Sequence, residues 1–310
     1  TLAMERTVYL DYAATTQVDP RVVDAMLPYL TEHFGNPNAL YGLGRESARA
    51  HEEARERVAA AIGAARPGEV VFTSGGTESD NTAVIGLATA GGRTQGHLVV
   101  SAVEHHAVLD PARWLAARGF SLTELTPRSD GVIHPEDLAA AMRDDTVLVS
   151  VMHGNNEIGT LQPIAELASA AHARGALFHT DAAQTLGKVD IDVKALGVDA
   201  MSFSAHKIYG PKGVGALYLK RGVRLAPYLM GGGQESRRRS GTQNGAGSMA
   251  LATALELMDA ERSEEAPRLA ALRDRVAAFA VANIPDVRLN GADAAARLPH
   301  ILSMAFAGVS

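Results

Sequence analysis

The sequence predicts an α/β protein, with a mostly parallel β-sheet that carries helices on both faces. Three observations lead to this prediction. Short apolar segments alternate with segments of helical periodicity over most of the chain, which is the pattern of parallel strands joined by crossover helices. The 310 residues are 46% apolar, enough for two domains with a large core. After Gly245 the alternation stops, which indicates a second, smaller unit.

The chain is expected to begin with helices. Asp19-Pro20 is typical of a helix cap followed by proline in the first turn. Pro28 is expected to kink the helix that begins at Pro20. A second helix, residues 45–62, should end at Gly63. The alternating elements follow: strands 69–73, 97–102, 121–126, 146–153, 176–180, 198–203 and 214–219, and helices 77–90, 107–118, 135–143 and 163–174.

The C-terminal part is predicted to form the smaller unit. Two helices are expected, to about residue 257 and from about 266 to 282, and short strands around Leu289, Ile301 and Phe306. We therefore expect a large domain over residues 15–250 and a small α+β domain made of residues 1–14 and 251–310. An apolar strand at the end of the chain would have few partners, so we expect the C-terminal part of the small domain to be missing.

Composition limits the function classes. The formal net charge of −6 indicates no general affinity for nucleic acid. We find no apolar segment long enough to span a bilayer and no secretory signal, so we expect a cytoplasmic protein without membrane partners. The chain contains no cysteine, which excludes disulfides and cysteine-ligated metals within these residues. We predict no metal site, because the paired histidines His105-His106 lack the spacing of a zinc protease.

Lys207 and Asp181 suggest the chemistry. Lys207 follows the apolar segment 198–203 and precedes a glycine-rich turn, and Asp181 follows the strand predicted over 176–180. A partly desolvated lysine favours its neutral amine, which can attack an aldehyde. Since ligands gather at the carboxyl ends of parallel strands, we predict a pyridoxal 5'-phosphate (PLP) site. Lys207 would form the Schiff base, and Asp181 would contact the pyridine nitrogen.

Other strand ends carry polar residues that allow two interpretations each. The turn before Gly76-Thr77 can hold a phosphate at a helix N-terminus, or it can be an ordinary capped turn. His105 can stack on a cofactor ring or be structural. The amides of Asn155 and Asn156 can bind a carboxylate or the cofactor's phenolic oxygen, or they can stabilise a turn.

A basic, glycine-rich segment, residues 231–242, follows the last predicted strand of the sheet. Charge runs of this kind usually form solvated surface, and we favour that interpretation for Arg237 and Arg238. Arg239 and Thr242 fit a functional role better if they are supplied by another subunit.

Taken together, the motifs resemble the cysteine desulfurases of the NifS/IscS type, within the class V aminotransferases. The resemblance runs from about Val8 to the end of the chain. It rests on these segments: Leu10–Thr16, Phe34-Gly35-Asn36-Pro37, Thr73–Asn81, Glu104-His105, Asn155–Gly159, Asp181–Gln184, Ser204–Lys207 and Arg239–Thr242.

This resemblance implies a fold-type I PLP enzyme and a homodimer. It implies that His105 stacks over the ring and takes part in catalysis with Lys207, and that Gln184 contacts the phenolic oxygen. The phosphate would be held by a set of residues that includes Thr242 from the neighbouring subunit: Gly76, Thr77, Ser204, His206 and Thr242. Asn156 would contact cofactor and substrate, and Asn36 the substrate.

The implied reaction takes sulfur from L-cysteine, leaves L-alanine and passes the sulfur through an enzyme persulfide to a protein for iron–sulfur assembly or thiolation. The expected persulfide cysteine and a substrate-binding arginine would lie beyond Ser310, so we expect a truncated chain that binds PLP but performs no persulfide transfer alone. Three alternatives remain open: a selenocysteine or cysteine-sulfinate lyase, another class V transaminase, and a non-catalytic partner with the same fold.

Overall fold

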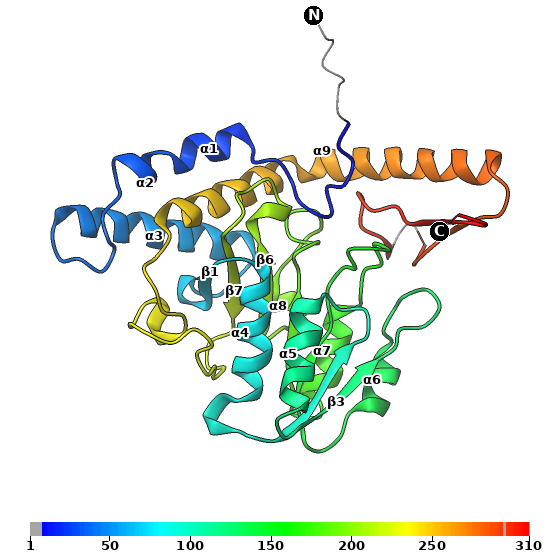
Figure 1. Ribbon diagram of the computed structural model, residues 1–310, viewed down its shortest axis with the longest axis horizontal. Coiled ribbons are helices and arrows are strands. Elements are labelled where there is room, and N and C mark those ends of the chain that lie inside the picture. Colours follow the sequence, from blue (N-terminus) through cyan, green and yellow to red (C-terminus); the bar gives the residue numbers. More distant parts are fainter. Residues whose placement is uncertain (1–7, 294–295, 310) are drawn as a thin grey trace, which may run out of the picture.

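The computed structural model describes residues 8–293 and 296–309, so residues 1–7, 294–295 and 310 of the predicted small domain lie outside the described part. A seven-stranded sheet with the order β1-β7-β6-β5-β4-β2-β3 forms its centre (Figure 1). Only β7 runs antiparallel to its neighbours, which confirms the predicted α/β class with a mostly parallel sheet. The strands are β1 (Val70–Thr73), β2 (Gly96–Ser101), β3 (Phe120–Leu125), β4 (Thr146–Ser150), β5 (Leu177–Asp181), β6 (Ala200–Ser204) and β7 (Gly215–Leu219).

Most helices connect successive strands, as the alternation predicts. The helices are α1 (Pro20–Met26), α2 (Pro28–Thr31), α3 (Gly42–Ala61), α4 (Gly76–Ala88), α5 (His106–Ala116), α6 (Pro135–Ala141), α7 (Ile164–His172), α8 (Val193–Leu196) and α9 (Gly245–Asn283). Asp19 caps α1 by accepting a hydrogen bond from the Arg21 N–H. Pro28 begins α2, and Leu27 between the two helices keeps helical backbone angles, so the helix is interrupted at the place where the kink was expected. The short α8 was not predicted.

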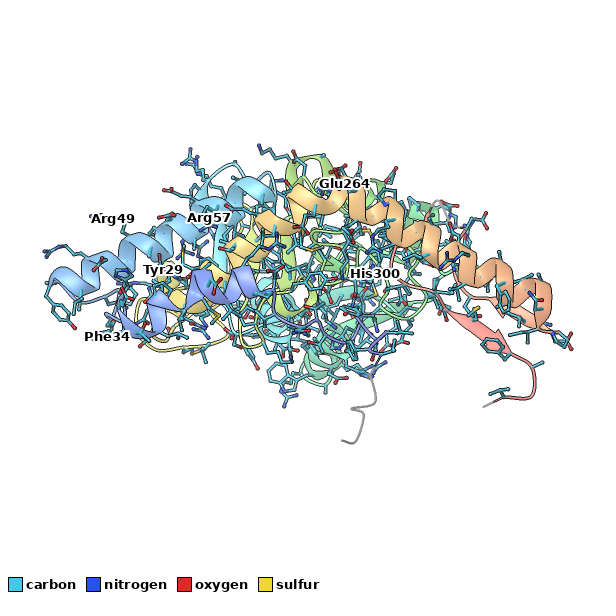
Figure 2. The ribbon with its side chains drawn as sticks, turned by 90° about the horizontal axis from the view of Figure 1, so that it is seen from above. Tyr29, Phe34, Arg49, Arg57, Glu264 and His300 are labelled. Atoms are coloured by element: carbon cyan, nitrogen blue, oxygen red, sulfur yellow. The ribbon has the colours of Figure 1, made fainter. Side chains whose placement is uncertain are left out.

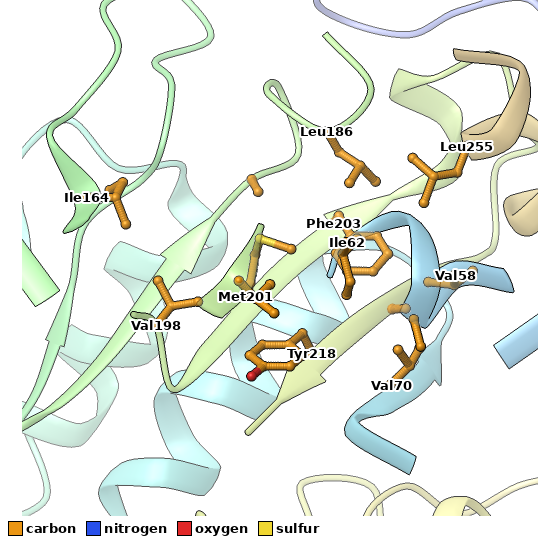
Figure 3. Packing of buried hydrophobic residues seen from close by; sticks show 14 of the residues in the cluster. Val58, Ile62, Val70, Ile164, Leu186, Val198, Met201, Phe203, Tyr218 and Leu255 are labelled. Atoms are coloured by element: carbon orange, nitrogen blue, oxygen red, sulfur yellow. The ribbon is translucent and has the colours of Figure 1, made fainter. Parts of the chain in front are cut away.

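The two faces of the sheet are covered by different helices, because successive strand side chains point to opposite sides. In β1, Val71 packs with apolar residues of α4 and α5, whereas Val70 and Phe72 pack on the other side. That second side is covered mainly by α3, α7 and α9. Figure 3 shows part of this cluster, including Met201 and Phe203 of β6 and Leu255 of α9.

The helix α9 departs from the prediction of two C-terminal helices. It is one continuous helix of 39 residues, with Pro267 inside it. The sequence suggested a gap because residues 259–265 are mostly polar and solvent-exposed, so the apolar spacing that marks a helix is lost there. Its first half lies along α3, where Arg57 (labelled in Figure 2) pairs with Glu256 at 2.6 Å. Because α9 crosses residue 250, the two expected domains share a helix, and the division at that residue stays a prediction.

The C-terminal strands form a separate antiparallel pair, β8 (Val287–Leu289) and β9 (Met304–Phe306), near the end of α9 (Figure 1). Strands were expected near Leu289 and Phe306, and these two are found. Ile301 is buried but lies outside a strand. Among the described residues, no helix combines the length and apolar character that crossing a membrane requires.

Candidate active site

A cavity of about 570 Å³ opens at the carboxyl edge of the sheet, within the size range of small-molecule sites. Segments that follow five strands reach it, because the carboxyl ends of parallel strands share one edge. Nine residues singled out from the sequence line this cavity: Gly76, Thr77, His105, Asn156, Asp181, Gln184, Ser204, His206 and Lys207.

Lys207 lies at the end of a short 3-10 turn, η3 (Ala205–Lys207), directly after β6. Its Nζ donates to the backbone carbonyls of Ala13 and Ala14, at 2.5 and 2.8 Å. Burial lowers the pKa of the Lys207 ammonium, although the carboxylates of Asp181 and Asp11 partly oppose this. The amine is therefore positioned and easier to deprotonate than an exposed lysine, as a nucleophile towards an aldehyde must be.

Asp181 is the last residue of β5, and its side chain is buried. Oδ1 accepts a hydrogen bond from the Ala183 N–H at 2.8 Å. Burial raises the pKa of Asp181, while that hydrogen bond, His105 and Lys207 favour its ionised form. A carboxylate held in this way can stabilise a cationic N–H group that enters the cavity.

Two further buried carboxyls, those of Asp80 and Glu104, are influenced by the charge of Asp181. Asp80 of α4 lines the cavity, and burial together with Asp181 raises its pKa. Burial also raises the pKa of Glu104 to about 8, although Ser101 Oγ and the Met152 N–H donate hydrogen bonds to this side chain. Burial and like charge both disfavour ionisation, so Glu104 keeps its proton at pH 7, and Asp80 is harder to ionise than an exposed aspartate.

The N-terminus of α4 forms a cradle opposite β6. Gly75 precedes the helix with φ of +150°, a conformation that favours glycine. A Cβ on Gly76 would lie 3.6 Å from Ser204 Cβ, so the missing side chain keeps the space between them open. Ser204 Oγ is buried and has no hydrogen-bond partner among the described residues. Free helix N–H groups and an unpaired hydroxyl together are suited to a phosphate.

His206 and the N-terminal segment close the cavity near this cradle. His206 Nδ1 lies 3.1 Å from Thr15 Oγ1, and its carbonyl accepts from the Thr16 N–H at 2.9 Å. Burial, reinforced by nearby lysines, lowers the pKa of His206 to about 4. The imidazole is therefore neutral at pH 7, and it offers a hydrogen bond rather than a full positive charge.

His105 and Gln184 lie on other walls of the cavity. His105 is the N-cap of α5, and its Nδ1 accepts from the Ala107 N–H at 3.1 Å, which leaves the proton of a neutral ring on Nε2. Gln184 donates from Nε2 to the Ala13 carbonyl at 2.8 Å. Its Oε1 is buried without a partner among the described residues. Both side chains therefore keep polar capacity that the chain itself does not use.

The two asparagines after β4 have different roles. Asn155 is buried, and its Oδ1 accepts from the N–H groups of Glu157 and Ile158, both at 2.9 Å. Asn155 therefore stabilises a turn, the second of the two interpretations that the sequence allowed. Asn156 lines the cavity, and its amide contacts Glu157 Oε1 at 2.9 Å.

Asn36 and Thr242, which the sequence also singled out, lie outside this cavity. Asn36 is exposed, and its Oδ1 accepts from the Asn38 N–H at 3.0 Å, so it stabilises its own turn. Thr242 is also exposed. Neither residue lines the space around Lys207, so a role for either in a cofactor or substrate site requires a second copy of the chain.

Sequence reasoning missed some residues that shape the cavity. The carbonyls of Ala13 and Ala14 hold Lys207, yet a backbone acceptor carries no signal in the residue type. Asp80 had a signal, since it follows Gly76 by four residues and therefore faces the same side of α4. An acidic residue on the same face of that helix as Gly76 was the available signal.

Comparison with known proteins finds close relatives over almost the whole chain. The model of the family "Aminotransferase class-V" matches residues 8–310. A protein from Dictyoglomus turgidum named cysteine desulfurase IscS is 49% identical over 306 residues, which are 99% of this chain and 77% of the relative. One of the same name from Methanosarcina thermophila is 48% identical, over 92% of this chain and 70% of the relative.

Solved structures agree with these relatives. A structure titled NifS-like protein superimposes with a TM-score of 0.93 at 38% identity, covering 98% of this chain and 83% of the other. Another, titled SspA in complex with cysteine, has a TM-score of 0.78 at 42% identity, covering 81% and 72%.

Proposed function

The chain belongs to the Aminotransferase class-V family, and from this premise we propose how its cavity serves the reaction of a PLP-dependent cysteine desulfurase. The curated relatives described above carry that name, and the chain is an enzyme of this type, which removes sulfur from L-cysteine and leaves L-alanine. The comparisons do not favour the lyase, the transaminase or the non-catalytic partner.

One observation carries the assignment of the site. The amine of Lys207 and the carboxyl of Asp181 line the same cavity, next to a helix N-terminus with the unpaired hydroxyl of Ser204. An aldehyde, a basic ring nitrogen and a phosphate are the groups that these three features suit, and PLP combines them. The residues present therefore fit the cofactor that the family uses.

The phosphate would be held at the N-terminus of α4. Gly76 and Thr77 would offer backbone N–H groups, Thr77 and Ser204 hydroxyls, and His206 a ring nitrogen. His206 is neutral at pH 7 and adds no positive charge. The helix N-terminus would therefore provide most of the electrostatic stabilisation of the phosphate. Thr242 would add a hydroxyl from the partner subunit.

The ring would be held by His105, Asp181 and Gln184. When bound, PLP supplies an electron-withdrawing ring that stabilises negative charge developing next to the substrate amine. Asp181 would keep the ring nitrogen protonated, and Gln184 would hydrogen-bond the phenolic oxygen. Lys207 would hold the aldehyde carbon and, once released, carry protons between substrate and cofactor carbons. His105, with its proton on Nε2, would stack on the ring and act as acid or base.

The substrate side is formed by Asn156, whose amide would contact the carboxylate of L-cysteine, and Asn36 would contribute from the partner subunit. The 310 residues contain no cysteine, so a thiol outside them has to accept the sulfur. We propose a homodimer in the cytoplasm that delivers sulfur to an acceptor protein for iron–sulfur assembly or thiolation.

The test is cofactor uptake by the purified chain. We expect the wild type to become yellow with PLP and to keep that absorbance after gel filtration, because the lysine linkage is covalent. Lys207→Ala should lose it, whereas the exposed Lys212→Ala should retain it. A wild type that remains colourless, or a Lys207→Ala variant with the same spectrum as the wild type, would refute the proposal.

A further inference from the structure

The segment before Thr242 has an unfavourable backbone. Three consecutive residues, Glu235, Ser236 and Arg237, have φ of 47°, 56° and 64°. None is glycine, although side chains with a Cβ avoid the left-handed region. Such a conformation persists only where its surroundings fix it, and it is found preferentially at functional positions.

The side chain of Glu235 fixes this turn. It is buried, with 2% of the side chain exposed, and it accepts four hydrogen bonds. Arg55 donates from Nη1 at 2.6 Å and from Nη2 at 2.8 Å, His51 from Nε2 at 2.9 Å, and the Phe72 N–H at 3.0 Å. Burial alone would raise the pKa of Glu235, but Arg55 and His51 lower it to about 2.

The groups that donate to Glu235 lie on helices and strands of the main fold. His51 and Arg55 lie on α3, and Phe72 lies on β1. Arg55 also donates to the Val70 carbonyl of β1 at 2.7 Å, and His51 Nδ1 lies 3.0 Å from Ser248 Oγ of α9. Glu235 therefore ties the left-handed turn to two helices and a strand at once.

Several contacts fix the backbone between this turn and Thr242. The Gly241 N–H donates to Gln234 Oε1 at 3.0 Å, and the Ser240 N–H donates to the Leu229 carbonyl at 3.1 Å. Arg239 pairs with Glu78, in the first turn of α4, at 2.7 Å. These contacts leave Thr242 exposed, outside its own subunit's cavity.

We propose that Glu235 is a positioning residue for Thr242, and that it acts on the cofactor site of the partner subunit rather than on its own. The inference rests on the proposed function, in which the chain is a dimer and Thr242 contacts the partner's phosphate. It adds the physical device: a buried carboxylate holds an unfavourable turn so that a hydroxyl is presented across the interface.

Mixed dimers test this inference, with PLP affinity measured from visible absorbance. In the first mixed dimer, one subunit carries Glu235→Gln and the other carries Lys207→Ala. The intact Lys207 then receives Thr242 from a subunit with normal Glu235. In the second, both substitutions lie on one subunit, and the intact Lys207 receives Thr242 from the altered subunit. The reference is a dimer of wild-type and Lys207→Ala subunits.

We expect the first mixed dimer to bind PLP like the reference. The second should bind about tenfold more weakly, the loss expected for one hydrogen bond to a charged group. Glu52→Gln is the matched control, because it removes the exposed carboxylate on the same Arg55 and should leave affinity unchanged. If Glu235→Gln fails to fold, Glu235→Asp replaces it, since it keeps the charge but is too short to reach all four donors.

The reverse pattern, or equal weakening in both mixed dimers, would overturn the inference, because Glu235 would then act within its own subunit or on the fold as a whole. A wild-type homodimer that takes up no PLP would instead refute the proposed function, and the inference with it. Normal uptake by a homodimer of Thr242→Ala would refute only the proposed contact across the interface and this inference, while the role of Lys207 would stand.

Discussion

Lys207 donates a hydrogen bond from Nζ to the backbone carbonyl of Ala14 at 2.8 Å, although 193 residues separate them along the chain. The same N-terminal segment contacts Gln184 through the Ala13 carbonyl and His206 through Thr15. It therefore forms one wall of the cavity and covers part of the Lys207 side chain. By partly burying Lys207, this segment helps to lower the pKa of its amine, which makes the amine a better nucleophile.

The first prediction concerns the pH dependence of cofactor capture. Because burial lowers the pKa of Lys207, the fraction of neutral amine at a given pH is larger than for an ordinary lysine. The rate at which cofactor-free protein captures PLP should therefore rise with pH and reach half its maximum below the ordinary lysine pKa of about 10.4. Stopped-flow absorbance measures this rate, with Nα-acetyl-lysine as the reference amine. A midpoint equal to that of the reference would contradict the prediction.

The second prediction compares two serines of β6. Ser204→Ala removes a hydroxyl without a partner among the described residues, so the cofactor-free protein should keep its stability or gain about 1 kcal/mol. PLP affinity should fall about tenfold, because a hydrogen bond to a charged group is lost. Ser202→Ala should instead lower stability by about 1 kcal/mol, because Ser202 Oγ lies 2.9 Å from His179 Nε2.

Urea unfolding and absorbance titration of both serine variants separate these effects. Equal losses of affinity in Ser204→Ala and Ser202→Ala would mean that the Ser204 hydroxyl has no special place in the phosphate cradle.

The third prediction concerns Glu104, whose pKa burial raises to about 8. The folded state then holds a proton that the unfolded state loses above a pH of about 4.3. This proton's contribution to stability is present below that pH and is lost as the pH rises through about 8. Glu104→Gln does not titrate, and its Oε1 can accept the same hydrogen bonds. The free energy of unfolding of Glu104→Gln, relative to that of the wild type, should therefore increase by a few kcal/mol from pH 5 to pH 9.

Urea unfolding of the cofactor-free proteins at pH 5, 7 and 9 measures that difference. Glu56→Gln, an exposed substitution on α3, controls for the change of residue type. A stability difference between Glu104→Gln and wild type that does not vary with pH would show that Glu104 is ionised in the folded protein.

The fourth prediction follows from the absence of cysteine in the 310 residues. A thiolate is the nucleophile that takes sulfur from a bound amino acid. Incubation of the PLP-loaded chain with L-cysteine should therefore leave its mass unchanged after desalting, and the protein should carry no cyanide-labile sulfur. Sulfur bound covalently to this chain would contradict the prediction and require another acceptor group.

Much of the architecture was predictable because it depends on local patterns. Apolar spacing located the strands of the sheet to within a few residues, since alternation and helical periodicity reflect which side chains can reach a core. The convergence of Gly76, Asp181 and Lys207 followed from one further rule, that parallel strands end at a common edge. Continuous α9 was missed because its exposed polar stretch has no such periodicity.

The sequence by itself therefore determined the α/β class, the order of the elements and the edge at which reactive side chains meet. Only the tertiary structure decided which groups hold them: the Ala13 and Ala14 carbonyls on Lys207, and the donors around Glu235. It also excluded Asn36 and Thr242 from their own subunit's cavity. The physical reason is that a residue type reports its own chemistry and periodicity, whereas a backbone acceptor or a buried ion pair exists only when distant segments are brought together.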